Sequence, residues 1–357
     1  MTAGQPAGRE GKVPPEFLER VVFANLGAKR GSVLVRPGHG LDNAVISLGG
    51  SKVLLVTSDP LSVIPSLGWE VSGWLSVHLL ASDLATSGVS PQFAMLDFNL
   101  PPKMDLASVE TYLKAVGKEC GNLGIAIVGG HTGRYPGSGY TVVGGGVMFS
   151  VTHEGSYVTP AMARPGDTVL MTKGAGVGAT AVLAHSFPQA VGEKVGTRLL
   201  RKARSRLLEC STVKDAAAAA GVGLHTAVTS MHDATEGGVL GGLLEMSSAC
   251  GFPIVVELEK INVPDDVAAV CRVFGLDPLV TLSEGTLLIT CRRSAVELVQ
   301  TALAKAGVVS HQVATVGTTR RGRGLWSAVR GSNLRPLSPV RDRYWEAYSS
   351  AVERGLR

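Results

Sequence analysis

Short apolar runs bounded by glycine or proline alternate with longer helical stretches, and this alternation restricts the fold more than any other feature of the sequence. In the first half, the β-rich runs lie at 52–59, 91–100, 124–132 and 141–151. Helical stretches at about 69–87 and 105–121 separate them. A second alternation of strand and helix signals follows "TPAMARPGD" at 159–167. The sequence therefore predicts a mixed α/β (α+β) protein made of two units.

The breaks in this pattern divide the chain into four segments. We expect a loose N-terminus at 1–14, a first domain at 15–157, a second domain at 158–325 and an appended C-terminal helix at 326–357. The 357 residues suffice to bury two cores.

Composition and charge argue against several classes of protein. The net charge is +5 and no basic tract is interleaved with aromatic residues, so we expect no nucleic-acid partner. The five cysteines are scattered without a C-x-x-C pair, which argues against a disulfide framework or a zinc site. No apolar run is long enough to span a membrane, and the first residues lack a signal-peptide pattern. We therefore expect a cytoplasmic protein without a membrane partner.

The stretch "TSMHDATEGGVLGGLLEM" at 229–246 places two carboxylates before a glycine pair and an apolar helix. Asp233 and Glu236 have the spacing of a capping box, in which each side chain satisfies a backbone N–H at a helix start. Asp233 is also placed to bind a metal ion. On either interpretation, Glu236→Gln should have almost no effect, because Gln also serves in a capping box.

Three further aspartates lie at turns or at the ends of predicted elements. Asp42 lies between a glycine and an apolar strand, Asp59 ends a strand, and Asp83 lies near the C-terminal end of an apolar helix. The helix dipole disfavours a carboxylate there, so a cation should compensate Asp83. Oxygen ligands without a cysteine cluster are typical of Mg²⁺ with substrate phosphates. His78, on the same helix, has the spacing of a packed core residue.

Another motif points to a different class of enzyme. Gly174-Ala-Gly176-Val-Gly178-Ala179 follows an apolar strand and has the form of a dinucleotide-binding turn. The strand with an acidic end that should follow about 20 residues later is missing. An NAD(P)-dependent oxidoreductase is therefore the third alternative.

Five segments, taken in order, resemble the family of AIR synthetase, thiamine-monophosphate kinase, selenophosphate synthetase and the hydrogenase-maturation protein HypE. They are Leu41-Asp42-Asn43-Ala44, Ser58-Asp59, Ser82-Asp83-Leu84, Gly129-Gly130-His131-Thr132 and the Met-x-Asp-x-Thr-x-Gly-Gly pattern that begins at Met231. The second domain is most similar to that of HypE, including the turn Ser283-Glu284-Gly285.

This resemblance implies a two-domain AIR-synthetase-like fold whose N-terminal sheets pair in a dimeric barrel. It also implies an enzyme that uses ATP and Mg²⁺ to phosphorylate an oxygen of a small, amide-like substrate. Asp83 and Asp233 would be catalytic, and the metal ligands would be Asp42, Asp59, Asp83 and Asp233. The nucleotide would contact Gly40, Asn43, Thr57, Gly129, Gly130 and Thr132. Further site candidates are His131, Glu236 and Glu284.

Departures from the family pattern leave a second interpretation open. Asn43 and His131 replace acidic residues, and the sequence ends "ERGLR" without the C-terminal cysteine on which HypE carries its substrate. The alternative is a non-catalytic nucleotide-binding or partner protein of the same fold. We expect a homodimer in either case, because strands such as 141–151 have apolar residues on both faces.

Overall fold

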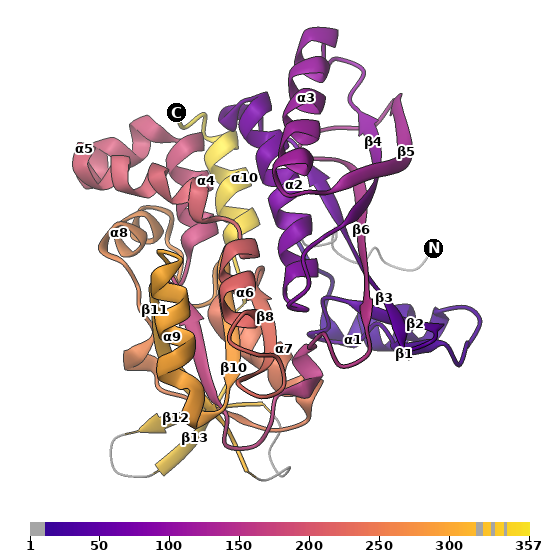
Figure 1. The fold of residues 1–357 in the computed structure, drawn as a ribbon. Helices are drawn as coiled ribbons and strands as arrows, with labels where there is room; N and C mark the ends of the chain where they lie inside the picture. The colour runs from indigo at the N-terminus through magenta and orange to yellow at the C-terminus, as the bar shows by residue number, and fades with distance from the viewer. Residues whose placement is uncertain (1–10, 319–323, 330–332, 339–340) are drawn as a thin grey trace, which may run out of the picture.

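The computed structural model describes residues 11–318, 324–329, 333–338 and 341–357. Most of the N-terminal segment expected at 1–14 therefore lies outside the described residues. The N-terminal unit is a six-stranded sheet with two long helices on one face (Figure 1). Its strands, in sheet order, are β1 (Val33–Val35), β2 (Ala44–Gly49), β3 (Lys52–Ser62), β6 (Val142–His153), β4 (Phe93–Leu100) and β5 (Ala126–Arg134). Its helices are α1 (Pro15–Phe17), α2 (Trp69–Ala85) and α3 (Leu106–Asn122).

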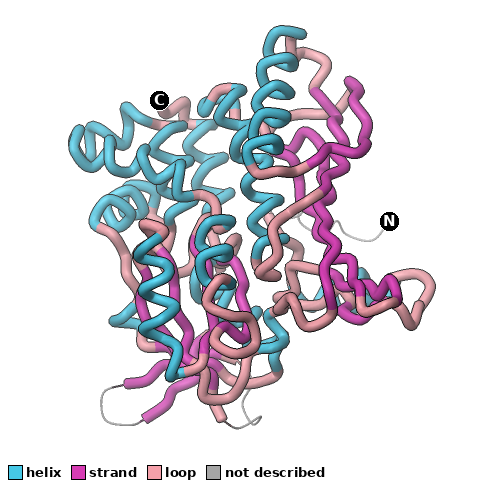
Figure 2. The backbone as a smooth tube through the Cα atoms, viewed as in Figure 1, coloured by secondary structure: helices cyan, strands magenta, loops and turns pink. Residues whose placement is uncertain are grey.

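Helix α2 lies between the two units, which explains why its sequence is apolar on nearly every side. Figure 2 shows the N-terminal strands at one side of the molecule, with α2 and α3 between them and the C-terminal unit. Leu80 and Leu84 join the core of the N-terminal sheet, whereas Leu75 packs with helices of the second unit. His78 is buried and stacks on Trp74 with ring centroids 4.1 Å apart, so the expectation of a packed histidine is confirmed.

The C-terminal unit is a seven-stranded sheet with helices packed around it. Its strands, in sheet order, are β13 (Asn333–Leu337), β12 (Leu325–Val329), β9 (Ile254–Val256), β11 (Ser310–Val316), β7 (Thr168–Thr172), β10 (Thr286–Cys291) and β8 (Val228–Ala234). Its helices are α4 (Val177–Ser186), α5 (Pro188–Ser205), α6 (Val213–Ala220), α7 (Gly238–Cys250), α8 (Asp265–Phe274), α9 (Val296–Lys305) and α10 (Tyr344–Glu353). Strands and helices alternate as expected, yet among the described strands of this second sheet only β12 and β9 pair in parallel.

The C-terminal segment differs from the single appended helix expected at 326–357. Strands β12 and β13 form an antiparallel pair, and β12 extends the sheet beside β9. Helix α10 begins only at Tyr344. The first half of the segment is drawn into the sheet because β9 offers a free edge there, which local sequence does not reveal. No helix within the described residues is long and apolar enough to cross a membrane.

Candidate metal and nucleotide site

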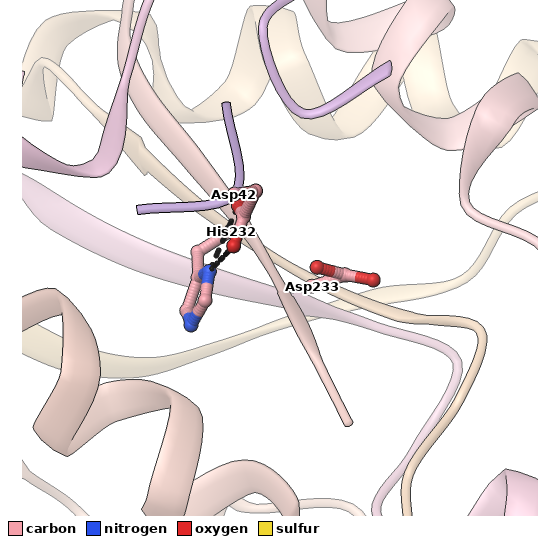
Figure 3. Close-up of side chains that lie close together, drawn as sticks. All are labelled: Asp42, His232 and Asp233. Atoms are coloured by element: carbon pink, nitrogen blue, oxygen red, sulfur yellow. Dashed lines mark hydrogen bonds and ion pairs between the residues drawn. The ribbon is translucent and has the colours of Figure 1, made fainter. Parts of the chain in front are cut away.

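Two of the predicted metal ligands meet at the junction of the two units. Asp42, His232 and Asp233 each place one potential ligand atom within 4.8 Å of the others (Figure 3). Asp42 lies in the loop before β2, whereas His232 and Asp233 are consecutive residues of β8. The site therefore depends on how the two sheets are docked.

The imidazole ring of His232 lies between two carboxylates. Its Nδ1 donates to Asp42 at 2.8 Å, and its Nε2 donates to Glu245 of α7 at 3.0 Å. Both nitrogens can donate only when the ring is protonated. Burial alone would lower the pKa of His232, but Asp42 and Glu245 raise it well above its ordinary value. The charged ring thus fastens the Asp42 loop to α7.

Three more carboxyl groups, those of Asp59, Asp83 and Glu284, interact electrostatically with Asp233. Burial, followed by repulsion from Asp233, raises the pKa of Asp83 and of Glu284 well above the ordinary range. Burial likewise raises the pKa of Asp59 to about 6 and that of Asp233 to about 7. A divalent cation would relieve the repulsion. Both nitrogens of His232 are already bonded to Asp42 and Glu245, so the remaining donors are carboxylate oxygens, which suit Mg²⁺. The residues present therefore fit the metal that the sequence predicts.

The raised carboxyl pKa values predict that stability without a metal decreases as the pH rises. A carboxyl group whose pKa is raised on folding stabilises the folded state fully below its unfolded pKa of about 4. That contribution is lost as the pH passes the folded values of about 6 for Asp59 and about 7 for Asp233. In EDTA, we expect the melting temperature to fall between about pH 5 and about pH 8. Mg²⁺ should raise it more at the higher pH. Equal Mg²⁺ effects at both pH values, measured by calorimetry, would contradict this expectation.

Three residues expected at the nucleotide also hold the site together. Thr57 Oγ1 donates to the Asp83 carboxylate at 3.2 Å. Asn43 Nδ2 donates to the backbone oxygen of Asp83 at 2.8 Å, which fixes the Asp42 loop to α2. The buried Oδ1 of Asn43 finds no hydrogen-bond partner among the described residues. Gly40 lies against α7, where an added Cβ would be 2.4 Å from the carbonyl oxygen of Glu245.

The predicted nucleotide loop lies elsewhere in this chain. Gly129, Gly130, His131 and Thr132 are exposed residues of the edge strand β5. The register aligns Gly130 with Leu96, Gly146 and Asp59 across β4, β6 and β3. Three strand spacings therefore separate Gly130 from Asp59, about 14 Å. His131 bonds to Tyr135 at 2.6 Å instead. Within one chain, these residues do not join Asp42 and Asp233.

Asp233 and Glu236 do not form the capping box that their spacing allows. Asp233 lies inside β8, and α7 begins at Gly238 after Gly237, which has a φ of +86°. Glu236 instead accepts hydrogen bonds from the backbone N of Lys12 and from Nε1 of Trp345. The strand persists to Ala234 because β8 pairs with β10 up to that residue. The expectation that Glu236→Gln is silent therefore loses its physical basis.

Comparison with known protein families shows to which family the chain belongs. The model for the N-terminal domain of AIR synthase related proteins matches residues 40–149, and the model for their C-terminal domain matches residues 164–327. The chain belongs to the AIR synthase related family. The resemblance and the two-domain fold expected from the sequence are thus confirmed.

Two relatives with named activities are similar to this chain over about the same share of its length. Carbamoyl dehydratase HypE of Cupriavidus necator is 28% identical over 270 residues, which cover 71% of this chain and 69% of that protein. Selenide, water dikinase of Myxococcus xanthus is 26% identical over 268 residues, which cover 74% of this chain and 72% of that protein. A crystal structure of HypE in complex with ATP superposes with a TM-score of 0.64 at 19% identity, covering 94% of this chain and 97% of that one.

In this AIR synthase related chain, the glycine-rich turn at 174–179 has a packing role. Ser283 Oγ accepts a hydrogen bond from the backbone N of Gly176 at 2.8 Å. A Cβ at Gly178 would lie 2.8 Å from Glu284, and residues 174–184 are buried. The glycines allow the turn that carries Glu284 to approach α4. The start of this helix is therefore covered by the chain itself, which argues against the dinucleotide alternative.

Three residues of the site were not predicted from the sequence. His232 lies next to Asp233, but nothing in the local pattern pairs it with Asp42. Glu245 lies in an apolar helix, where it has the appearance of a solvated residue. Lys12 belongs to the segment expected to be loose, yet its Nζ donates to Thr235 Oγ1 at 2.9 Å. Burial opposes the charge on Lys12, but Glu245 and Glu236 raise its pKa. All three depend on tertiary contacts.

Proposed function

We propose that this protein is an ATP- and Mg²⁺-dependent enzyme that phosphorylates an oxygen of a small, amide-like molecule. One observation carries the proposal. Asp42 and Asp233 meet at the domain junction, and the charges of Asp59 and Asp42 act on the nearby Asp83, so that several carboxylates share one region with only His232 and Lys12 as partial compensation. The named activities of HypE and of selenide, water dikinase, together with the HypE structure containing ATP, support the choice of nucleotide.

The chain's own residues supply positioning rather than covalent chemistry. His232 orients Asp42, Thr57 orients Asp83, and β8 holds Asp233 at its end. Mg²⁺ bound by these carboxylates would neutralise phosphate charge, which is the main requirement of phosphoryl transfer. Asp233 is almost completely buried, which strengthens its electrostatic effect because little water screens it.

The proposal is tested first by binding and then by turnover. Calorimetry should detect binding of a non-hydrolysable ATP analogue in the presence of Mg²⁺ and little binding in EDTA. ADP production should then be screened with purine-ribonucleotide, thiamine-phosphate and thiocarboxamide-type substrates. Absence of Mg²⁺-dependent binding would refute the proposal. Binding without turnover of any candidate would favour the non-catalytic alternative, which Asn43 suggests by using its amide nitrogen to hold α2.

We also propose that the protein is a homodimer formed through the open face of the N-terminal sheet. Helices α2 and α3 cover only one face (Figure 1). On the other face, Met95 is 48% exposed, Val151 is 36% exposed, and Phe93 stacks on Phe149. The edge strand β5 pairs only with β4 among the described strands. An uncovered apolar face beside a free edge is typical of a surface that another chain covers.

Sedimentation tests this arrangement directly. We expect the wild type to sediment as a dimer at micromolar concentration and Met95→Arg to shift towards the monomer, because the charge would be buried in the interface. Leu208→Arg is the matched control, since Leu208 is 76% exposed on the C-terminal unit. A monomeric wild type, or equal behaviour of the two variants, would rule out this dimer.

A further inference from the structure

The C-terminal helix α10 is fastened to the loop that follows Asp233. Asp342, just before α10, accepts a hydrogen bond from the backbone N of Gly237 at 3.1 Å. Trp345, in the first turn of α10, donates through Nε1 to the carboxylate of Glu236. These contacts come from a segment beyond residue 327, where the match to the family's C-terminal domain ends.

Helix α10 can serve as a fixed support because its other side is part of a core. Tyr344 and Ala351 are almost completely buried among residues of α4, α5 and α8. Tyr348 packs on Phe187 with ring centroids 5.5 Å apart. In Figure 1, α10 lies beside α4 and α2, between the two units. A shift of α10 would disturb this packing, so the loop at 235–237 is held by a rigid element.

The N-terminal segment closes on the same carboxylate. The backbone N of Lys12 donates to the second carboxylate oxygen of Glu236 at 2.8 Å. Gly11 lies against the Trp345 ring: a Cβ added at Gly11 would be 3.0 Å from Cδ1 of Trp345. Lys12 Nζ reaches Thr235, and its charge acts on Asp233. Glu236 thus joins segments from both ends of the chain, at one side of the candidate metal site.

We propose that Trp345, Asp342 and Glu236 are positioning residues, which hold the loop at 235–237 so that Asp233 and Thr235 face the Mg²⁺–nucleotide complex. This inference rests on the proposed function for its ligand. Residues that hydrogen-bond to metal ligands or to the adjoining loop fix the geometry of those ligands, and their loss changes the affinity for the metal. Asp233 is the last but one residue of β8, so its orientation depends on how the chain continues after Ala234.

The test compares Trp345→Phe with Tyr348→Phe. The first change removes the indole donor to Glu236, and the second removes one hydroxyl from the same helix on the side that faces Phe187. We expect Trp345→Phe to raise the Mg²⁺ concentration for half-maximal binding of an ATP analogue about tenfold. Tyr348→Phe should leave this concentration unchanged. Glu236→Gln should lie between the two, because Gln offers one acceptor oxygen where Glu236 accepts from two donors.

Hydrogen exchange provides a readout that does not require a bound nucleotide. The Gly237 amide should exchange faster in Trp345→Phe than in the wild type or in Tyr348→Phe, since the bond to Asp342 loosens when the loop is released. Equal exchange and equal Mg²⁺ dependence in the two aromatic variants would overturn the positioning role. If the wild type fails to bind Mg²⁺ with the ATP analogue, the proposed function fails. The exchange comparison then still decides whether α10 holds the loop.

Discussion

We expect Asp233→Asn to reduce Mg²⁺-dependent ATP turnover by at least about 100-fold, because a preorganised charge aimed at the reacting phosphate is lost. Without a metal, the same variant should melt at pH 8 no lower than the wild type. Burial and the neighbouring Asp42 charge raise the pKa of Asp233 to about 7, so its ionised form opposes folding. A neutral amide of similar size removes that penalty. Turnover assays and calorimetry in EDTA measure the two effects.

The control for this variant is Asp265→Asn. Asp265 is an exposed carboxylate at the start of α8 and lies outside the site. The Asp265→Asn variant should retain full turnover and gain no stability at high pH. If Asp233→Asn keeps normal turnover, Asp233 has no part in metal binding. If Asp233→Asn instead melts well below the wild type without metal, the Asp233 carboxylate stabilises the fold, contrary to what repulsion between the acidic groups predicts.

Gly40→Ala is expected to have the largest effect on the docking of the two domains. The added Cβ would lie 2.4 Å from the carbonyl oxygen of Glu245, so either the loop or α7 must move. Such overpacking costs about 1–3 kcal/mol of unfolding free energy. The movement would also separate Asp42 from His232, whose 2.8 Å bond depends on this close approach. We therefore expect a lower melting temperature together with weaker Mg²⁺-dependent nucleotide binding.

Gly49→Ala separates the steric cause from backbone strain. Gly49 has a φ of +81° and Gly40 a φ of +68°, so alanine meets a comparable left-handed conformation at both positions. An added Cβ at Gly49 has no heavy atom within 4 Å. Denaturant unfolding should show a larger loss for Gly40→Ala, and only this variant should lose Mg²⁺ affinity. Equal losses would mean that the contact with α7 does not hold the site.

The main elements of both units follow from the local sequence. The helical stretches at 69–87 and 105–121 appear as α2 and α3, and the four β-rich runs of the first half appear as β3, β4, β5 and β6. Periodicity and glycine punctuation suffice for this, because the burial of one helix face or one strand face leaves a repeat in the chain itself. The same local signals placed Asp42 in a turn and Asp83 near the end of α2. Asp59, however, lies inside β3 rather than at its end, because pairing with β6 continues the strand to Ser62.

Only the tertiary structure decided what these residues do together. Asp233 had the spacing of a helix cap, but pairing of β8 with β10 keeps it in a strand that faces Asp42. Glu236 had the same local signature, but it receives its partners, Lys12 and Trp345, from opposite ends of the chain. Long-range contacts of this kind leave no periodic trace, because either partner alone is an ordinary surface residue. The sequence by itself determined the elements and the acidic residues available for a metal, and the docking of two sheets determined which of them meet.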